Sequence, residues 1–535
     1  MQPDRNQINA LPEDPALLQA LLLAAWSERD KVVAERNDLA EQNERLQHLL
    51  LKFNRLQFGA KSEKLPEEQL QLALGDIETA IAQLEAQGER RDPARKRDGI
   101  AKRRASRGAL PAHLPRVEVT LTPEDINCPC CRAAMNEIGH DESQRLDIIP
   151  AQYRVIVTRR PKFVCQACEG VVAQAPAPAR LIEGGIPTEA LVANVMVSRF
   201  ADHLPLYRQA QIMARQGVLI DRATLAFWVG YGAAEIVPVV RRLKEIVLSS
   251  TRIFADETTM KVLDPGRGRT KQGYFWVAAR DDRACGSAEP PAVIYQYATG
   301  RAKRHADALL GGYRGVVQCD GYNAYKQLAA PARDGPPVTL AFCWSHVRRG
   351  FYDFVKDGTS PIATEALARI ATLYRIEAEI RGQDPAQRLA KRQELSQPLV
   401  KDLRLWLEAQ LNTLPARSPI AQVIRYPLNH WAGLEQFLLD GRVEIDNNTV
   451  ERSMRPITLS RKNSLFAGSD EGAENWAAVA SLIETCKLND VNPQTYFTDL
   501  LTRLVNGWPQ ARIDELMPWC WIDRHSLTPK SLPKS

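Results

Sequence analysis

Three acidic residues stand in local strings whose residue types suit chemistry on phosphate. Asp256 lies in RIFADETTMKV, Asp320 in GVVQCDGYNAYKQL and Glu451 in VEIDNNTVERSMRPI. The first two come at the ends of short apolar runs that predict strands, and the third opens a helix-like stretch. Mg²⁺ binds one or two carboxylates together with waters and substrate phosphate oxygens. Since two such ions can clamp the attacking and leaving oxygens of an in-line displacement, the pattern favours metal-dependent phosphodiester chemistry on nucleic acid.

Basic side chains follow Glu451 along the same predicted helix. We expect them to contact phosphates near the scissile bond, and the simpler alternative is a solvated helix face. The residues are Arg452, Arg455, Arg461 and Lys462.

The acids also have simpler structural explanations. The first could cap a turn, and Asp320 precedes Gly321 in a pair that is common in turns. Glu451 follows Asn448 at the spacing of a capping box and precedes Arg455 at the spacing of a helical ion pair. Other carboxylates nearby compete for a metal: Glu257, Glu444 and Asp446.

Five of the ten cysteines fall within residues 128–168, in the strings CPCC and CQAC. Two CxxC pairs can present four thiolates to one Zn²⁺ and so organise a fold. The strand-like run 153–164 can bring the second pair back to the first. Cys130 could replace a neighbour, and the alternatives are a disulfide or scattered buried cysteines. The predicted structural zinc ligands are Cys128, Cys131, Cys165 and Cys168.

The formal net charge of +6 is concentrated in residues 86–116, where ten Lys and Arg face three acids. Such a segment, poor in apolar residues, predicts a flexible arm. We expect Arg103 and Arg104 to contact DNA phosphates, which gives salt-dependent affinity without sequence preference. The alternative is a linker whose charge only confers solubility.

A helical pattern precedes this arm. Val32, Leu39, Leu46 and Phe53 recur every seven residues, but the second seam position is apolar only in the last two turns. The pattern favours self-association as a coiled coil. The alternative is an amphipathic helix that packs on its own chain, including the helical stretch 66–86.

Residues 186–230 predict a helix-turn-helix arrangement. Helices are expected over 187–203 and 204–217, and a third is expected to begin with Asp221 as its N-cap. Any small helical bundle gives a similar pattern. The apolar stretch 17–26 is too short to span a bilayer and lacks the basic start of a signal peptide, so we expect a cytoplasmic protein without a membrane partner.

Several strings resemble those of the insertion sequence 66 family of bacterial transposases. They are FADETTMKV, QCDGYNAY, CWSHVRRGF and DNNTVERSMRPITLSRKNSLFAGSDEG, and the resemblance extends to LQFGAKSEKL, ALPAHLPRVEV and HLPLYRQAQI. The resemblance implies a leucine-zipper region, a zinc-binding domain and a ribonuclease H-like core with a helical insertion. It also implies a catalytic triad of Asp256, Asp320 and Glu451 that holds Mg²⁺ or Mn²⁺ and acts on element ends and target DNA. Relatives commonly act with small accessory proteins.

The sequence pattern agrees with this multidomain α/β architecture. Strands are predicted at 253–257, 272–280, 292–298 and 315–320, the first three antiparallel. The gap from Asp320 to Glu451 is about twice that from Asp256 to Asp320, and an inserted helical subdomain explains it. In CWSHVRR, Cys343 and His346 could form a metal pair, but we expect them to support the core beside Asp320 and not to be catalytic ligands, with Trp344 packing or stacking on DNA. The expected domains are a zipper-like region (1–86), a basic linker (87–116), a zinc-binding domain (117–180), a helix-turn-helix-like region (181–245), the catalytic domain (246–465, insertion about 361–440) and a helical C-terminal region (466–535).

Two other functions fit parts of this pattern. A nuclease or resolvase would share the metal core but would not transfer strands. A DNA-binding regulator would use the zinc and helical modules without catalysis.

Overall fold

The computed structural model describes residues 14–58, 92–106, 152–164, 172–264, 269–330, 338–356, 360–464 and 466–525. The chain forms two compact units, Met1–Ile149 and Pro150–Ser535, and each is described by itself.

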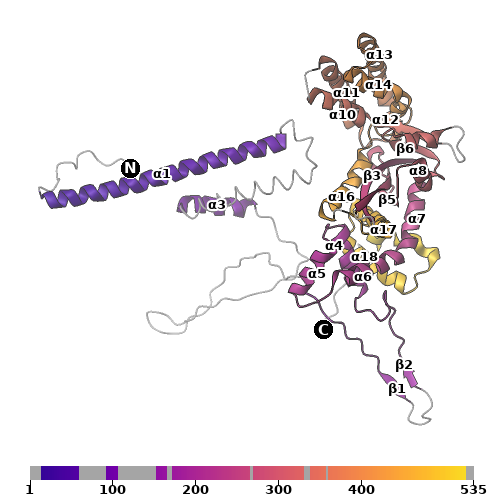
Figure 1. Cartoon of the computed structure of the whole chain (residues 1–535), viewed down its shortest axis with the longest axis horizontal. Helices are drawn as coiled ribbons and strands as arrows, with labels where there is room; N and C mark the ends of the chain where they lie inside the picture. The colour runs from indigo at the N-terminus through magenta and orange to yellow at the C-terminus, as the bar shows by residue number, and fades with distance from the viewer. Residues whose placement is uncertain are drawn as a thin grey trace. The chain divides into compact units, whose positions relative to one another are not determined.

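The first unit contains two described helices, α1 (Pro15–Phe58) and α3 (Pro93–Ser106) (Figure 1). The predicted N-terminal helix is confirmed as a helix. Its side chains Leu21, Trp26 and Val32 are 51%, 53% and 59% exposed, so they are not buried against the described residues. Self-association through this helix stays a prediction.

Helix α3 lies within the segment that we expected to be a flexible arm, so that expectation is wrong for this stretch. Asp92 explains where the helix begins, because its Oδ1 accepts a hydrogen bond from the backbone nitrogen of Ala94 at 2.8 Å. Pro93 then fits the first helical position, and the Ala, Lys and Arg that follow are good helix formers. The side chains of Arg103 and Arg104 lie outside the described part of the chain.

The second unit begins with a small antiparallel hairpin of strands β1 (Lys162–Val164) and β2 (Val172–Gln174). Cys165 follows β1 directly, and β2 begins four residues after Cys168. The expected strand-like run is therefore a strand only at its end. All the cysteines of the predicted zinc site lie outside the described residues, so the ligand set stays a prediction.

A mixed five-stranded sheet forms the centre of this unit, in the order β5-β4-β3-β6-β7. Strands β3, β4 and β5 are antiparallel, whereas β6 and β7 run parallel to β3. The predicted antiparallel trio and the strand before Asp320 are confirmed. Helix α8 (Lys303–Leu310) supplies the crossover that a parallel connection needs. The strands are β3 (Arg252–Asp264), β4 (Arg269–Arg280), β5 (Ala292–Ala298), β6 (Gly315–Cys319) and β7 (Val338–Phe342).

Helices cover both faces of the sheet and one edge. The covering helices are α7 (Val237–Leu248), α16 (Asn448–Ser464) and α17 (Asp470–Leu488). The Tyr295 hydroxyl donates to the Ser453 carbonyl of α16, while Gln296 accepts from Lys244 of α7 at 2.8 Å. Neighbouring residues of a strand point to opposite faces, so α16 and α7 cover opposite sides.

Helix α17 covers the exposed edge of β5. The backbone nitrogens of Val293 and Tyr295 donate to Thr485 Oγ1 at 3.2 Å and to Ser481 Oγ at 2.9 Å. These side-chain bonds satisfy edge groups that would otherwise be open to another strand.

The three helices expected before the sheet are present, at bounds slightly inside the predicted ones. They are α4 (Glu189–Phe200), α5 (Leu206–Arg215) and α6 (Arg222–Glu235). Asp221 is confirmed as the N-cap of α6, since its Oδ1 accepts from Thr224 N at 2.7 Å. Helix α18 (Pro493–Val505) joins them, and Gln494 donates to the Ala190 carbonyl of α4 at 3.3 Å. These helices share one hydrophobic cluster with the sheet and α17.

The helices expected between residues 361 and 440 are also present and have a core of their own. They gather beyond the β6–β7 side of the sheet, away from α4–α6 (Figure 1). Helix α10 (Trp344–Lys356), which precedes this range, shares the core. The elements of the insertion are α11 (Pro361–Ile380), α12 (Pro385–Lys391), η5 (Arg392–Ser396), α13 (Gln397–Thr413), α14 (Pro419–Asn429), α15 (Trp431–Leu434) and η6 (Gln436–Leu438). The remaining short elements are η3 (Arg283–Cys285), α9 (Asn323–Lys326), η4 (Gln327–Ala329), η7 (Gln510–Leu516) and α19 (Pro518–His525).

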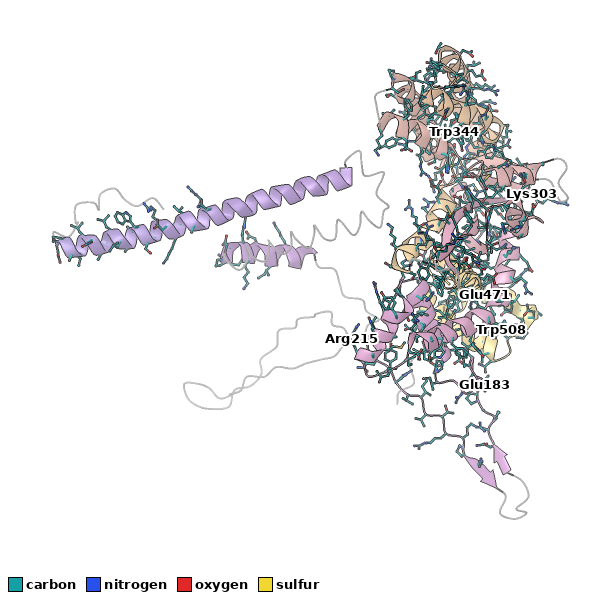
Figure 2. The ribbon with its side chains drawn as sticks, viewed as in Figure 1. Glu183, Arg215, Lys303, Trp344, Glu471 and Trp508 are labelled. Carbon is teal, nitrogen blue, oxygen red and sulfur yellow. The ribbon has the colours of Figure 1, made fainter. Side chains whose placement is uncertain are left out.

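Trp344 belongs to this second core. Its side chain is fully buried, and its indole nitrogen donates to the Leu434 carbonyl at 2.9 Å (Figure 2). Of the two expected roles, packing is therefore confirmed, and stacking on DNA is excluded because neither face of the ring is accessible.

None of the described helices is by itself long and apolar enough to cross a membrane, and one pair, α6 with α7, passes that test only together, bent by 51°.

His203 joins the helical bundle to α16 and gives a pH-dependent prediction. Its Nδ1 shares a hydrogen bond with Ser460 Oγ at 2.5 Å, and its backbone adopts φ 57°. Burial, aided by the charge of Lys487, lowers the pKa of His203 from 6.5 to about 4. The unfolded chain therefore binds a proton between these values that the folded chain does not, so stability falls as the pH drops through this window.

We expect His203→Asn to lessen this loss, because Asn tolerates positive φ but has no charge to gain. Thermal unfolding midpoints at about pH 7.5 and about pH 5 measure the effect. If the unfolding midpoint falls equally between the two pH values in wild type and in His203→Asn, His203 is not the source of the pH dependence.

Candidate active site

Asp256 lies within β3, where this strand continues past its pairing with β6, and Asp320 directly follows β6. In the parallel pair β3 and β6, Phe254 lies opposite Gln318, and each acid follows two residues later. Asp320 Oδ1 accepts from Tyr322 N at 2.8 Å, so the turn predicted for this acid is formed. Asp320 therefore both forms the turn and lies beside Asp256.

The carboxyl group of Asp256 is buried among other carboxylates. The residue is 8% exposed, and its Oδ1 accepts from the backbone nitrogen of Glu257 at 2.8 Å. Burial raises the pKa of Asp256 well above its usual value, and the charges of Glu257, Asp320 and Glu451 raise it further. The other two predicted acids therefore both lie close enough to Asp256 to repel its charge. A divalent cation would relieve that repulsion.

Glu451 occupies the first turn of α16, and the start of this helix is fastened to β3. The Asn447 side chain donates to the Ala255 carbonyl at 3.2 Å, and Glu451 N donates to the Asn447 carbonyl at 3.3 Å. The backbone nitrogen of Asn448 donates to Asp446 Oδ1 at 3.1 Å. Because this N–H is the one that a capping box would give to Glu451, the capping-box alternative is not realised.

Two side chains of α10 approach Glu451 instead. Its Oε1 lies 3.8 Å from His346 Nδ1, and its Oε2 lies 4.0 Å from an Arg349 guanidinium nitrogen. The sulfur of Cys343, just before α10, belongs to the same group. The sequence favoured a supporting role for Cys343 and His346 over a metal pair, and Arg349 was not among the predicted site residues. The spacing C-x-x-H at a helix start was the signal that could have indicated their convergence.

The competing carboxylates have partners of their own. Glu257 points to the face of β3 opposite Asp256, where its oxygens accept from Arg301 Nε at 2.6 Å and from the Tyr325 hydroxyl at 2.7 Å. Glu444 pairs with the buried Arg388 at 2.8 Å. Asp446 accepts from the backbone nitrogen of Asn448 and so caps the start of α16.

The inserted helices contact the turn that carries Asp320. The Tyr426 hydroxyl of α14 donates to the Asp320 carbonyl at 2.8 Å, and the His430 ring lies beside Gly321. A Cβ added at Gly321 would come within 2.9 Å of that ring, and the residue has φ +83°. Glycine is therefore required here for both space and backbone conformation.

Gln318 connects β6 to the chain that returns from the insertion. Its amide nitrogen donates to the Glu444 carbonyl at 2.9 Å, and its amide oxygen accepts from Glu444 N at 2.9 Å. The side-chain amide thus bonds to both backbone groups of Glu444, as the backbone of a neighbouring strand would. It holds the segment before Glu451 against the strand that leads to Asp320.

The basic residues of α16 divide into two groups. Arg452, Arg455 and Lys462 are exposed. Arg461 is partly buried, and its guanidinium donates to Thr259 Oγ1 at 2.8 Å and to Thr458 Oγ1 at 3.1 Å. This contact braces α16 against β3, so Arg461 is already engaged within the protein.

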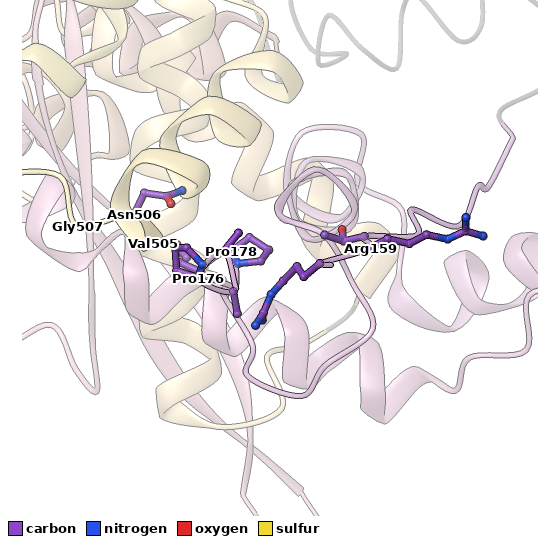
Figure 3. A pocket seen from close by; sticks show the side chains of 11 residues that line it. Arg159, Pro176, Pro178, Val505, Asn506 and Gly507 are labelled. Atoms are coloured by element: carbon purple, nitrogen blue, oxygen red, sulfur yellow. The ribbon is translucent and has the colours of Figure 1, made fainter. Parts of the chain in front are cut away.

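A shallow pocket of about 800 Å³ lies elsewhere in the second unit (Figure 3). It is lined by residues 158–160 and 175–179 near the hairpin and by Val505, Asn506 and Gly507 after α18. None of these lining residues carries a carboxylate. The pocket therefore does not coincide with the acidic site.

Family comparison identifies the chain. The model described as Transposase IS66 family matches residues 184–475, which include the three acids, the inserted helices and α16. The chain belongs to the IS66 transposase family. Three further models of the family match: the IS66 C-terminal element at 481–519, a region described as Transposase C of IS166 homeodomain at 45–119, and the zinc-finger binding domain of transposase IS66 at 125–169.

Similar proteins span nearly the whole chain. One from Sinorhizobium fredii, named uncharacterized protein y4qI, is 42% identical over 96% of this chain and 95% of its own length. Another from the same organism, uncharacterized protein y4jD, is 44% identical over 88% of this chain and 93% of its own. The matched domains support an insertion-sequence transposase. The zinc-finger match contains all five clustered cysteines and supports a structural Zn²⁺.

Proposed function

We propose that this IS66 family member cuts DNA at the ends of its element and joins the freed 3′ hydroxyls to target DNA. The observation that carries the proposal is the β3–β6 register, which brings Asp320 beside Asp256, together with Glu451, whose charge adds to burial in raising the pKa of Asp256. The sheet order, with three antiparallel and two parallel strands followed by a helical insertion, supports a ribonuclease H-like core.

The donor set of the three acids suits Mg²⁺ or Mn²⁺, because both ions prefer carboxylate oxygens. When bound, such ions would stabilise charge on the transferring phosphate and activate the attacking oxygen. The chain's own part is to fix the carboxylates. Asp256 is held in the central strand, Asp320 in a turn bonded to α14, and Glu451 in a helix start bonded to β3.

DNA is the proposed partner. Exposed guanidinium and ammonium groups lie on α16, which carries Glu451, and on α10, which approaches it, namely Arg349, Arg452, Arg455 and Lys462. They are suited to phosphate contacts, which position DNA and weaken as salt rises. Arg103 and Arg104 on α3 add positive charge in the first unit.

Glu451→Gln tests the proposal, because it removes the charge and keeps the shape. On labelled DNA carrying the element's ends, with Mg²⁺, we expect strand cleavage and joining to fall at least about 100-fold. DNA binding in a gel-shift assay should stay within about twofold of wild type, since the phosphate-binding residues remain. Glu379→Gln is the control, because this exposed glutamate of α11 lies on the inserted helices.

Three outcomes separate the candidate functions. Loss of both cleavage and joining in Glu451→Gln, with both retained in Glu379→Gln, supports the transposase. If the wild-type protein cleaves the DNA but does not join it to target DNA, a nuclease or resolvase is favoured. Unchanged cleavage and transposition in both Glu451→Gln and Asp256→Ala would leave only a DNA-binding regulator.

A further inference from the structure

Three potential metal ligands of different chemistry meet beside the acidic site. Cys343 directly follows β7, His346 lies in the first turn of α10, and Glu451 lies in the first turn of α16. One ligand atom from each lies within 4.8 Å of the other two. Residues more than 100 positions apart in the sequence thus come to one point.

Two of these ligand atoms have no other partner. His346 Nδ1 and Glu451 Oε1 are both buried, and neither has a hydrogen bond among the described residues. Their separation of 3.8 Å is too long for a direct hydrogen bond. Buried polar atoms are rarely left unpaired, so a group between them is expected. A cation bonded to each at about 2.0–2.2 Å fits between them with small side-chain movements.

The third ligand, the Cys343 sulfur, accepts hydrogen bonds from two backbone nitrogens, as metal-bound thiolates do. The side chain is buried, and its sulfur accepts from Asn447 N at 3.2 Å and from the backbone nitrogen of His346. Backbone N–H groups directed at a ligand atom stabilise its negative charge and fix its position. The same Asn447 ties the start of α16 to β3, so the sulfur and Glu451 are held by one element.

The mixture of ligands decides which ion fits. Zn²⁺ accepts thiolate, imidazole and carboxylate together, commonly with three protein ligands and one open position. Mg²⁺ and Ca²⁺ prefer oxygen ligands throughout. The cluster therefore suits zinc better than the ions proposed for Asp256 and Asp320.

We propose that Cys343, His346 and Glu451 bind a second zinc ion, separate from that of the zinc-finger domain. Binding displaces the thiol proton to solvent and leaves Glu451 Oε2, on the Arg349 side, available to other groups. The zinc holds Glu451 by one oxygen and thereby orients the third acid. The site depends on its own ligands and would stand even if the proposed DNA chemistry failed.

Zinc content of the purified full chain tests the proposal. After dialysis with excess zinc and then against zinc-free buffer, mass spectrometry should give one zinc per chain more in wild type than in Cys343→Ala or His346→Asn. Cys486→Ala and His305→Asn are matched controls, because Cys486 is an equally buried thiol on α17 and His305 lies on α8. Both controls should keep the wild-type zinc content.

A second measurement uses Co²⁺ in place of zinc. Absorption from thiolate-bound cobalt should fall in Cys343→Ala and remain in Cys486→Ala, beyond the constant contribution of the zinc finger. Circular dichroism checks that each variant is folded. If Cys343→Ala unfolds, the zinc content of folded His346→Asn still tests the proposal. Equal zinc content in wild type and folded His346→Asn overturns the proposal. Neither measurement uses DNA, so a negative result for the second zinc site can be told apart from a failure of the proposed transposase function.

Discussion

Replacing Asp256 with Asn will abolish strand cleavage and will raise the unfolding temperature of the metal-free protein. Burial and the nearby carboxylates raise the pKa of Asp256 above its unfolded value, so the ionised form destabilises the folded state. That penalty is absent below the unfolded pKa of about 3.9 and grows as the pH rises towards the folded pKa. Asn keeps the shape without the charge, so the variant gains stability at neutral pH and gains none below about pH 4.

The midpoint of thermal unfolding, with and without Mn²⁺, measures both effects. Without metal we expect Asp256→Asn to unfold about 2 °C or more above wild type at neutral pH. Added Mn²⁺ should stabilise wild type and Glu379→Gln but not Asp256→Asn, because ligand binding stabilises only a fold that holds the ligand. A variant that is less stable than wild type and still stabilised by Mn²⁺ would make this carboxylate structural.

Replacing Arg392 with Met will destabilise the inserted helices more than any surface change. Arg392 is fully buried and donates to both oxygens of Glu377, at 2.7 and 2.6 Å, and to the Phe437 carbonyl at 3.0 Å. Without Arg392, the buried Glu377 carboxylate keeps only its longer contact of 3.5 Å with Arg388, and breaking a buried ion pair costs about 3–5 kcal/mol. We expect a loss of this size in the free energy of unfolding of the insertion.

Urea denaturation, followed by tryptophan fluorescence, measures this loss. Arg404→Met is the matched control, because Arg404 forms an exposed pair with Glu408 and should cost at most about 0.5 kcal/mol. The double variant Arg392→Met with Glu377→Met should recover much of the stability, since buried pairs are often replaceable by apolar residues. A single Arg392→Met as stable as the control would contradict the buried pairing.

The same buried network connects the insertion to the acidic site. Arg388 pairs with Glu444, and the backbone of Glu444 bonds to Gln318 of β6, two residues before Asp320. The insertion is thus part of the support of the site and does not merely interrupt the sequence between the second and third acids.

Local patterns determined the elements of this fold. Apolar runs predicted the strands that carry Asp256 and precede Asp320, and helix period and capping residues predicted α4 to α6, including Asp221 as an N-cap. Strand alternation, helix period and capping are properties of a few neighbouring residues, so they can be read without the fold. The family strings identified the chain for the same reason.

Only the tertiary structure decided what surrounds each acid. The parallel register of β3 and β6 brings Asp320 beside Asp256, and the approach of α10 to the start of α16 brings His346 to Glu451. Arg461 contacts Thr259, and Trp344, for which packing and stacking on DNA were both open, packs in the inserted core. These pairings join residues tens to hundreds of positions apart, and the local sequence does not encode them because they depend on how complete elements pack. The sequence thus determined which residues could do chemistry, and the fold determined which of them meet.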